Sequence, residues 1–449
     1  MKRVLLLLAG LSLLTTTTGA QTGNNHLSLS QAVEAALGSQ PLMRSAQLGI
    51  DLAGKRVIEA RRGRLPTLRL TETVTRGNNP VFVFGSLLEQ SRFGSQNFSL
   101  TALNKPVSIT NVRSVVSASL PAFDGMRTSA LIAKANTVHD QVRLQKEGTE
   151  QRVRFEVLGQ YFGVLVAQAN RDVADEAVRT AEADLNRTKD RVAAGLAVES
   201  DRLAAQVQLA EFMQQQIESD ANLATAIIAL NVSIGSPPQS RYILTGTLSR
   251  KTFAAGRQEE LVQRAMLHRP DYAEASLRIQ FAENQAWEQR SEYLPEVNIF
   301  GSFASSGRNW ATGSADYALG ASVTLNLFDP GRSSRLSQAH IQQSLAHTER
   351  DRIRDQIVVE VARAYHRHRA AVQQLEVAET TQSQAAEALR IIQDRYDAGL
   401  TTIADLLRAE TALVRARLKV TSAIEAQYVS YANILLAIGE LKDVHAFES

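Results

Sequence analysis

The second half of this sequence repeats the first half at a nearly constant offset, and this duplication limits the possible folds more than any other feature. A shift of 204 residues superimposes residues 190–209 on residues 394–413, with nine of the twenty positions identical. Nearer the start of each copy the offset is 229, which pairs Pro66 with Pro295. A fixed internal period of this length indicates a duplicated structural unit. We therefore expect both copies to follow one plan.

The N-terminal residues have the pattern of a secretory signal peptide. Two basic residues precede an apolar run from Val4 to Leu14, and small residues follow as far as Ala20. This run is too short to span a bilayer, so residues 1–20 are predicted to be a signal peptide that is cleaved after Ala20. A buried N-terminal helix is the alternative interpretation. No later run of about 18 apolar residues occurs, so we expect no transmembrane helix.

Charge and cysteine content narrow the class of protein. The sequence has 49 basic and 46 acidic residues, and the two signs are interspersed along helix-like stretches. Such mixing is typical of solvated helix faces rather than of a nucleic-acid-binding surface, so no nucleic-acid partner is expected. Cysteine is absent, which excludes disulfides and a lipid anchor on an N-terminal cysteine.

Each copy is predicted to contain a helical region, two strands and two long helices. In the first copy, residues 21–235, Gly63 and Pro66 end the helical region, because the residue before a proline is disfavoured in the α conformation. Strands are indicated where apolar and polar residues alternate. The elements predicted here are a helical region at 30–63 with a break at Pro41, strands at 67–76 and 112–120, and helices at 125–193 and 198–235.

The second copy, residues 258–439, has the same order and a clearer alternation. From Tyr317 to Leu327 every second residue is apolar, and turn-forming residues at Gly307–Gly313 separate this strand from the preceding one. The elements predicted here are a helix at 258–290, strands at 295–304 and 317–327, helices at 331–398 and 401–438, a linker before the copy at 236–257 and a short polar tail at 440–449.

The two long helices of each copy are predicted to form a hairpin about 100 Å in length. About 68 residues without proline, at a rise of 1.5 Å each, set this length. Gly195 and Gly399 mark the reversals, because glycine suits the left-handed position after a helix. Asp124 and Asp329 are predicted N-caps, with Pro330 as the first helical residue of the second copy.

A helix of this length needs an apolar partner along its whole extent. The helical region before the first strand and the returning helix together nearly equal the long helix in length, so we expect them to stack end to end against it. A seven-residue spacing, interrupted by Thr421, predicts a coiled-coil seam on the second returning helix. The seam residues are Leu400, Leu407, Val414, Tyr428 and Leu435.

The four predicted strands match transmembrane strands of an outer-membrane barrel. Alternating segments of about ten residues have the length of a tilted membrane strand. Aromatic residues gather near them, as at membrane interfaces; they are Tyr293, Phe300, Phe303, Trp310, Tyr317 and Phe328. A half-buried soluble sheet is the alternative interpretation. Four strands leave two open edges, which a membrane does not tolerate, so we expect three copies to complete a twelve-stranded barrel.

The link between the two strands of the first copy, from Gly77 to about Asn111, is about 24 residues longer than its counterpart in the second copy. Outer-membrane barrels keep their longer loops outside the cell, so we expect this link to be extracellular and the helical hairpin tips to lie in the periplasm. The link contains four phenylalanines, Phe82, Phe84, Phe93 and Phe98.

Together these features resemble the outer-membrane efflux proteins, also called TolC-like proteins. The resemblance covers nearly the whole chain after residue 20. It rests on the duplication, the Leu-Pro entry to each first strand, the Phe-Asp start of each long helix, and two similar hairpin tips. The tips are Asp190-Arg-Val-Ala-Ala-Gly-Leu196 and Asp394-Arg-Tyr-Asp-Ala-Gly-Leu400.

The resemblance implies a mainly α protein with a membrane β-barrel, located in the outer membrane and in contact with its lipid. It implies a homotrimer with a twelve-stranded barrel and a twelve-helix periplasmic coiled-coil tunnel. A periplasmic adaptor and an inner-membrane transporter are the implied partners. The implied function is a passive exit duct for tripartite efflux or type I secretion.

The resemblance also assigns roles to residues near the tips. The position of Asp405 contributes an acidic ring that narrows the periplasmic end of the tunnel. Two positions depart from the pattern of the best-known member: Thr401 replaces an arginine of the latch, and Arg408 replaces a second acidic ring. A preference for acidic residues at helix starts is the alternative explanation for Asp405 and Asp201. The positions that latch neighbouring helices closed are matched by Tyr396, Ser200 and Asp201.

The turns of the two tips are predicted to dock the adaptor. Each presents an apolar leucine beside the turn glycine, and three copies would present six such tips. The docking residues are Gly195, Leu196, Gly399 and Leu400.

No catalytic or metal-binding motif is present, so we expect neither an enzyme nor a cofactor. His366 and His368 point to nearly opposite sides of a helix, and His340 and His347 lie about 10 Å apart along the axis, so all four are expected on solvated helix surface. A secreted coiled-coil structural or adaptor protein, and a periplasmic enzyme on an α+β scaffold, are the alternative functions. Drug, metal-ion and protein export all remain open.

Overall fold

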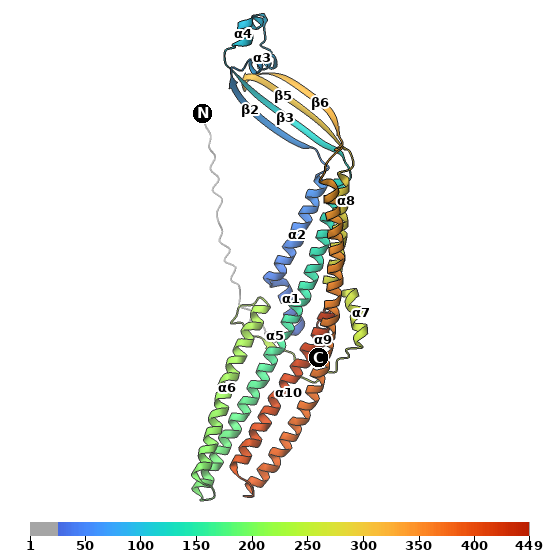
Figure 1. Cartoon of the computed structure of the whole chain (residues 1–449). Helices are drawn as coiled ribbons and strands as arrows, with labels where there is room; N and C mark the ends of the chain where they lie inside the picture. Colours follow the sequence, from blue (N-terminus) through green and yellow to red (C-terminus); the bar gives the residue numbers. More distant parts are fainter. Residues whose placement is uncertain (1–25, 449) are drawn as a thin grey trace, which may run out of the picture.

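The chain is elongated, with a small antiparallel sheet at one end and a layer of long helices at the other (Figure 1). The computed structural model describes residues 26–448, and the predicted signal peptide lies outside the described residues. Within the described range, no helix combines the length and the apolar character that crossing a membrane requires.

The first copy of the duplicated unit contains two short helices, two strands with a helical insert between them, and a long hairpin. In chain order these are α1 (Leu29–Ser39), α2 (Pro41–Arg62), β2 (Thr67–Gly77), α3 (Pro80–Glu89), η1 (Ser95–Phe98), α4 (Leu100–Asn104), β3 (Ile109–Asp124), α5 (Arg127–Ala193) and α6 (Glu199–Ser233).

The second copy has the same order without the insert. Its elements are α7 (Gln258–His268), α8 (Pro270–Ser291), β5 (Glu296–Asn309), β6 (Thr312–Thr324), α9 (Arg332–Asp397), α10 (Ile403–Ala437) and η2 (His445–Phe447). The returning helices α6 and α10 each have 35 residues and begin and end 204 residues apart. The offset seen at the tips therefore extends along both returning helices.

The helix predicted at 258–290 is two helices, because Pro270 interrupts it. Arg269 has φ −72° and ψ 123°, an extended conformation, and α8 starts at the proline. A proline ring disfavours the α conformation in the residue before it, while its own φ suits the first turn of a helix. The same break separates α1 from α2 at Pro41, so the two copies bend at equivalent places.

The strands differ from their predicted ends at the tip of the second hairpin. The predicted turn at Gly307–Gly313 is paired strand, with Gly307 opposite Gly313 in the ladder. The turn is limited to Trp310-Ala311, and the Asn309 side-chain oxygen accepts hydrogen bonds from the amides of Ala311 (3.1 Å) and Thr312 (3.0 Å). β6 ends at Thr324, so the alternation that continues to Leu327 lies partly outside the strand. β3 is longer than predicted and spans 109–124.

The four long strands form one antiparallel sheet in the order β2-β3-β5-β6. The register places one row of residues on the same face of all four strands, namely Leu70, Val116, Phe303 and Tyr317. All four of these apolar side chains are exposed. The outer strands, β2 and β6, each have one unpaired edge in this sheet.

The predicted caps at Asp124 and Asp329 lie two residues too early. α5 starts at Arg127 after Met126, whose φ is +70°, and α9 starts at Arg332, so Pro330 precedes the helix. The carboxylates still satisfy amides at the helix starts. Asp124 Oδ2 accepts from the amide of Thr128 at 2.7 Å, and Asp329 Oδ1 accepts from the amide of Gly331 at 2.8 Å.

The long helices obtain their partners as expected. α5 contacts α1, α2 and α6, while α9 contacts α7, α8 and α10. Of the predicted seam residues, Leu407, Val414 and Tyr428 are buried and Leu435 is partly buried. The prediction was wrong for Leu400, which is exposed at the hairpin tip before α10 begins. At the interruption, the Thr421 hydroxyl donates a hydrogen bond to Asn170 on α5 at 2.7 Å, so the polar seam position is satisfied by the neighbouring hairpin.

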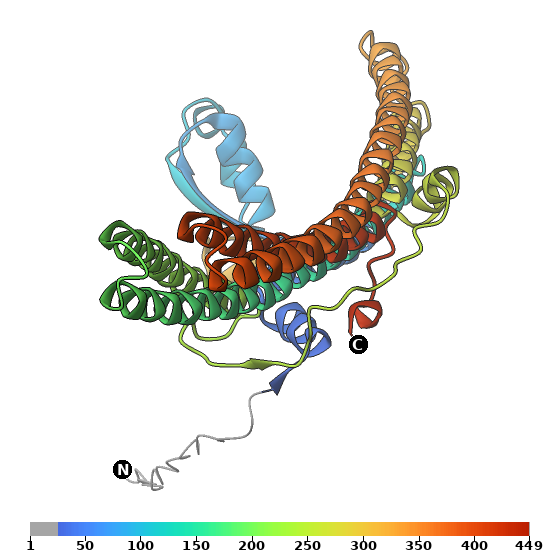
Figure 2. The ribbon, with the colours of Figure 1, turned by 90° about the horizontal axis from the view of Figure 1, so that it is seen from below.

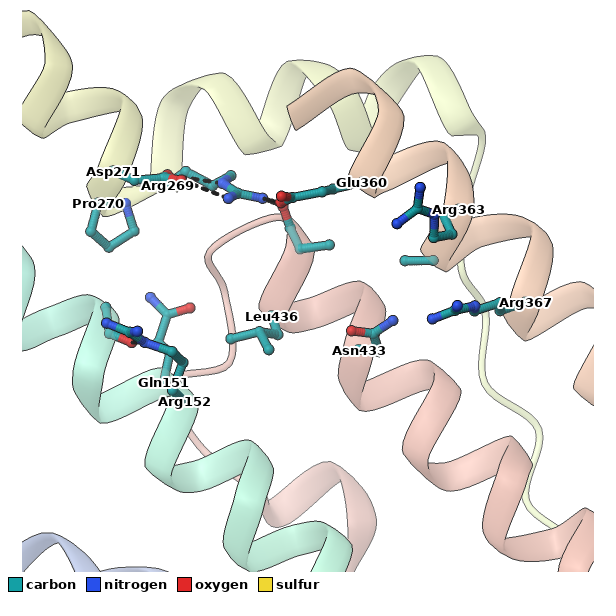
Figure 3. A pocket seen from close by; sticks show the side chains of 13 residues that line it. Gln151, Arg152, Arg269, Pro270, Asp271, Glu360, Arg363, Arg367, Asn433 and Leu436 are labelled. Carbon is teal, nitrogen blue, oxygen red and sulfur yellow. Dashed lines mark hydrogen bonds and ion pairs between the residues drawn. The ribbon is translucent and has the colours of Figure 1, made fainter. Parts of the chain in front are cut away.

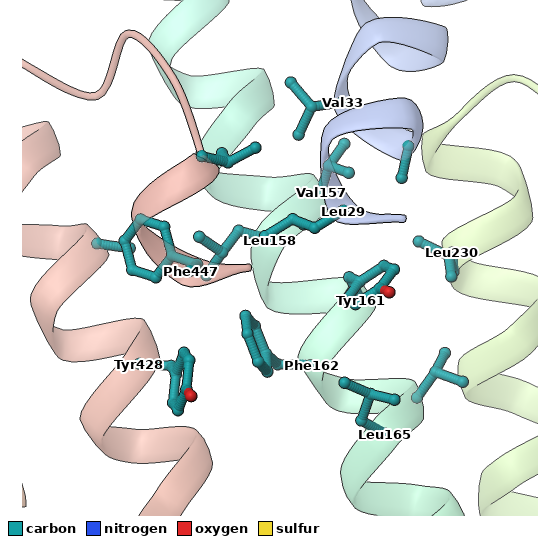
Figure 4. Packing of buried hydrophobic residues seen from close by; sticks show 14 of the residues in the cluster. Leu29, Val33, Val157, Leu158, Tyr161, Phe162, Leu165, Leu230, Tyr428 and Phe447 are labelled. Atoms are coloured by element: carbon teal, nitrogen blue, oxygen red, sulfur yellow. The ribbon is translucent and has the colours of Figure 1, made fainter. Parts of the chain in front are cut away.

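The main apolar core lies where α1 and the C-terminal segment meet α5 (Figure 4). Tyr161 is almost fully buried there, and its hydroxyl donates to the carbonyl of Leu27 at 3.1 Å. The linker contributes β4 (Ile243–Leu244), which pairs in parallel with β1 (His26–Leu27). The predicted polar tail is instead part of this core. Its buried residues are Leu441, Val444 and Phe447.

The helices form a curved layer when seen along their length (Figure 2). α1, α7 and the C-terminal segment lie on its convex side. The apolar faces of α5 and α9 that pack against these elements therefore also point to the convex side.

Candidate functional site at the hairpin tips

The two hairpin tips have the same backbone geometry. Gly195 and Gly399 have φ of +75° and +73°, a conformation that glycine adopts without steric cost. The amide of Leu196 donates to the carbonyl of Arg191, and the amide of Leu400 to that of Arg395, both at 2.8 Å. These bonds satisfy carbonyls at the end of each long helix. Leu196 is 71% exposed and Leu400 is 69% exposed, so each tip presents one apolar side chain to solvent.

Asp405 caps the start of α10. Its Oδ2 accepts hydrogen bonds from the hydroxyls of Thr401 (2.9 Å) and Thr402 (2.7 Å). These two hydroxyls, and then the amide of Thr402, hold the pKa of Asp405 below its ordinary value. Arg408 Nη1 lies 3.6 Å from Asp405 Oδ1. Within one chain this geometry agrees with the helix-start explanation for Asp405, and it gives Thr401 a function that the sequence did not reveal.

Asp201 has the corresponding position on α6. Its Oδ2 accepts from the amide of Val198 at 3.3 Å, which satisfies a free amide at the helix start. Ser200 is exposed beside it. Neither tip therefore needs a second chain to explain its acidic residue, and a role in a threefold aperture stays a prediction.

Tyr396 lies in the joint between the two hairpins, which is the region near the tips where α5 and α6 pack against α9 and α10. It is buried, and the Arg191 guanidinium carbon lies 4.7 Å from its ring centroid. Arg191 Nη1 also donates to the Tyr396 carbonyl at 3.4 Å. The apolar side chains packed with Tyr396 come from α5, α6 and α10, and they are Leu185, Ala205, Ile403, Leu406 and Leu407. The structure thus places Tyr396 in contacts within one chain.

Two buried carboxyl groups lie deeper in the same joint, and sequence analysis missed them. Asp184 on α5 is 5% exposed and Glu410 on α10 is 6% exposed. Burial, and then the neighbouring Asp184, raise the pKa of Glu410 to about 9, while Arg187 acts in the opposite direction. Arg187 Nη1 lies 3.4 Å from Asp184 Oδ1. One signal was available, because Glu410 lies seven residues after Ile403 and so occupies an inward-facing coiled-coil position.

A cavity of about 480 Å³ lies farther from the tips, where α8 begins and α10 ends (Figure 3). Arg269 forms a bidentate ion pair with Asp271, through Nε–Oδ1 at 2.9 Å and Nη2–Oδ2 at 2.6 Å. Its Nη1 also lies 2.7 Å from Glu360 Oε2 on α9 and donates to the carbonyl of Ala437 at 3.0 Å. Burial alone lowers the pKa of Arg269, but the two carboxylates outweigh this effect and raise it. Arg269 thus ties the break in the second copy to α9 and α10.

The four histidines discussed from the sequence, His340, His347, His366 and His368, all lie on α9. Among residues 26–448, no group of three or more His, Cys, Asp or Glu side chains is arranged to hold a metal ion. His366 is exposed as expected, but the prediction was wrong for His368, which is buried with Nδ1 3.0 Å from the Ser430 hydroxyl. Burial lowers the pKa of His368. The histidine therefore belongs to the packing between α9 and α10.

The chain is similar in sequence to two outer-membrane proteins and to a protease secretion protein. It is 25% identical to Outer membrane protein TolC of Vibrio cholerae over 316 residues, and this alignment covers 68% of this chain and 71% of that protein. It is 24% identical over 461 residues to Outer membrane protein TolC of Salmonella enteritidis, covering 99% and 87%. Alkaline protease secretion protein AprF of Pseudomonas aeruginosa is 22% identical over 316 residues, covering 67% and 64%.

The fold is similar to solved outer-membrane channels. The CmeC outer membrane channel of Campylobacter jejuni superimposes with a TM-score of 0.77 at 16% identity, covering 94% of this chain and 86% of that chain. The open state of the MtrE outer membrane channel of Neisseria gonorrhoeae has a TM-score of 0.75 at 19% identity, covering 92% and 89%.

The family model described as outer membrane efflux protein matches residues 32–236 and 261–440. The two matched segments correspond to the two copies of the duplicated unit and leave out most of the linker between them. The chain therefore belongs to the outer membrane efflux protein family, whose members are TolC-like channels of the outer membrane and not enzymes.

Proposed function

We propose that three copies of this chain form an exit duct that carries substrates from an inner-membrane transporter through the periplasm and across the outer membrane. A twelve-stranded barrel and a twelve-helix tunnel are the two parts of this duct. The observation that carries the proposal is the four-stranded sheet with an apolar face and two unpaired edges, placed at the end of a curved helical layer.

The sheet supports closure by other copies. Unpaired backbone groups at the edges of β2 and β6 are costly in lipid, where no water satisfies them. Pairing of β6 with β2 of a neighbouring copy removes both edges. The exposed apolar row that contains Leu70, Phe303 and Tyr317 then faces lipid, and the polar face of the sheet lines the lumen.

The duplication supports a matching contact between the helical hairpins of two copies. Within one chain, α10 lies against α5, with Arg417 Nη1 2.7 Å from Glu176 Oε2 and the Thr421 hydroxyl 2.7 Å from Asn170 Oδ1. In the duplicated unit, the residue equivalent to Thr421 is Ile217 on α6, which lies 204 positions earlier. Ile217 is 69% exposed.

The residue equivalent to Asn170 is Gln374 on α9, which lies 204 positions later and near the exposed Val377. If α6 of one copy lies against α9 of the next as α10 lies against α5, Ile217 meets Gln374 of the neighbouring copy. The burial of Ile217 and Val377 then stabilises the trimer by removing apolar area from water.

The tips support a partner at the periplasmic end. Leu196 and Leu400 are exposed at the ends of two similar turns, and a trimer presents six of them in a ring. We assign these tips, with Gly195 and Gly399, to docking of a periplasmic adaptor. We assign Asp405, with Arg408, Thr401, Tyr396, Ser200 and Asp201, to the aperture of the tunnel. The name alkaline protease secretion protein describes the relative AprF and assigns no cargo to this chain. In the proposed duct, the cargo is set by the inner-membrane transporter.

A cross-linking experiment tests the trimer. The chain has no cysteine, so Ile217→Cys with Gln374→Cys introduces only two thiols. A short thiol-specific cross-linker applied to outer membranes should produce dimers and trimers. The control is Asn170→Cys with Thr421→Cys, whose side chains meet within one chain and should give only an intramolecular link. A detergent-extracted monomer with full β content and no intermolecular link contradicts the proposal.

A further inference from the structure

The insert between β2 and β3, residues 78–108, has no counterpart in the second copy, where Trp310-Ala311 alone join β5 to β6. The insert is a folded unit. It contains α3, η1 and α4, and the ring of Phe93 packs edge-on against both Phe84 and Phe98, with centroid distances of 4.7 and 5.1 Å. Such a unit has its own apolar packing and therefore does not behave as an open loop.

The end of α3 is fastened to three strands of the sheet. Glu89 Oε1 lies 3.0 Å from Arg113 Nη1 on β3, and the same nitrogen lies 3.4 Å from Asp316 Oδ2 on β6. The next two residues of the insert add further contacts. Gln90 Nε2 donates to Asn111 Oδ1 at 2.9 Å and to the carbonyl of Gly307 at 3.3 Å, and the hydroxyls of Ser91 and Ser314 lie 2.8 Å apart.

The register shows which face of the sheet the insert covers. Arg113 is opposite Ser306, and Ser306 is opposite Ser314, so these three residues form one row across β3, β5 and β6. Side chains alternate between the two faces of a strand. The row that contains Val116 and Phe303 is three positions away and lies on the other, apolar face.

The insert therefore lies on the polar face, and the residues at the centre of this contact are buried. Ser306 is 0% exposed, and Gln90 and Asn111 are also buried. The apolar side chains of Val83 and Leu87 on α3 are also buried. Buried polar groups with hydrogen-bond partners indicate a specific docked position.

We propose that residues 78–108 fold into the outer mouth of the barrel and form the exit constriction of the duct, with the Glu89–Arg113–Asp316 cluster as its fastening. This inference rests on the proposed function, because the polar face of the sheet lines a lumen only when three copies close the barrel. The insert lies at the end of the sheet opposite the long helices (Figure 1). In the proposed trimer, three inserts therefore lie around the threefold axis at the end of the barrel opposite the helical tunnel.

The ion pairs among Glu89, Arg113 and Asp316 allow the insert to be released from the sheet. The side chains of Arg113, Glu89 and Asp316 are all partly exposed, and ion pairs in contact with water contribute little net stability. The ladder hydrogen bonds of β3, β5 and β6 do not depend on the insert. The insert is therefore able to leave the polar face while the strands remain paired, which widens the exit for passage of cargo.

A reversible disulfide tests this constriction. Ser91→Cys with Ser314→Cys places two thiols where the hydroxyls lie 2.8 Å apart, in a chain that has no other cysteine. In planar bilayers the oxidised double variant should conduct roughly twofold less than wild type, because the insert is held over the pore, and a reductant should restore conductance. Each single cysteine variant is a control and should show no redox response.

The opposite change should open the exit. Arg113→Ser removes the residue that joins Glu89 to Asp316 and should raise conductance and the sensitivity of cells to large antibiotics, while heat-resistant trimers persist. If mass spectrometry shows the disulfide formed and the oxidised channel conducts as wild type does, the insert does not cross the conduction path. If wild-type protein forms no channels at all, the proposed function itself fails, and the two failures are thus distinguished.

Discussion

The carboxyl groups of Asp184 and Glu410 face each other in the joint between the two hairpins, and both are shielded from solvent. They belong to α5 and α10, so they join the first copy of the duplicated unit to the second. Two carboxylates so close together in a poorly hydrated site repel each other, and this repulsion is removed when Glu410 keeps its proton. Protonation of Glu410 therefore stabilises the contact between the hairpins.

The first prediction concerns pH. Glu410 keeps its proton to higher pH in the folded chain, so between about pH 4.5 and about pH 9 the folded state binds more protons than the unfolded state. The free energy of unfolding then falls as pH rises through this interval. Glu410→Gln should remove the slope and stabilise the protein by about 2 kcal/mol near pH 8. Thermal unfolding followed by circular dichroism across this range measures the effect.

The control for this variant is Glu182→Gln, which changes an exposed acid on α5 two residues from Asp184. It should leave the slope unchanged. Equal slopes for wild type and Glu410→Gln would show that Glu410 does not hold an additional proton in the folded chain.

The second prediction concerns Asp405. In a threefold aperture Asp405→Ala should reduce the cation preference of the channel, and Arg408→Asp should increase it, because Arg408 partly neutralises the carboxylate. Thr401→Val removes a hydroxyl that holds the Asp405 pKa low, so cation preference should be lost at a higher pH than in wild type. Reversal potentials across a salt gradient, measured as pH is lowered, report both effects. Asp405 is only a helix cap if all three variants match wild type.

The third prediction concerns docking at the tips. Leu400→Asp should abolish efflux because it places a charge in an apolar contact with the adaptor, and it should not affect folding because Leu400 is exposed. Leu196→Asp tests the equivalent tip of the first copy. Tolerance of exported compounds is measured in cells that also express the partner transporter, with trimer content followed on unheated gels. Normal tolerance in both variants would place the adaptor contact elsewhere.

The fourth prediction concerns Arg269. Its side chain is 13% exposed and is paired with both Asp271 and Glu360, so Arg269→Met should destabilise the protein by about 3 kcal/mol because two carboxylates lose their partner. Arg363→Met is the matched control, since Arg363 lines the same cavity but is exposed, and it should change stability by less than about 0.5 kcal/mol. Similar losses in the two variants, measured by thermal unfolding, would contradict a stabilising role for the Arg269 ion pairs.

The fifth prediction concerns orientation. An epitope tag inserted at Ser95, in the insert between β2 and β3, should be accessible to antibody on intact cells, because longer loops of outer-membrane barrels lie outside. A tag placed after Gly399, at the tip of the second hairpin, should react only after the outer membrane is permeabilised. The reverse pattern would invert the proposed orientation.

The sequence alone determined the repeated order of helices and strands. The offset of 204 residues matches α6 and α10 at both ends, and alternation located the four long strands. These predictions succeeded because they depend on local periodicity, which each segment carries in its own residues. The break at Pro270 could have been predicted by the local rule that predicted the break at Pro41. The error at Gly307–Gly313 has another cause, because the pairing of these two glycines across the hairpin is a contact between segments.

Only the tertiary structure decided which residues meet. Glu410 occupies an inward position by its spacing, but its partner Asp184 lies 226 positions earlier on another hairpin. The burial of Tyr396 and of Phe447 likewise depends on elements far away in the sequence. Periodicity tells which face of a helix or strand is apolar, whereas the identity of the opposing residue depends on how whole elements are placed in space. For that reason the insert's position on the polar face of the sheet, through Glu89 and Arg113, emerged from the structure alone.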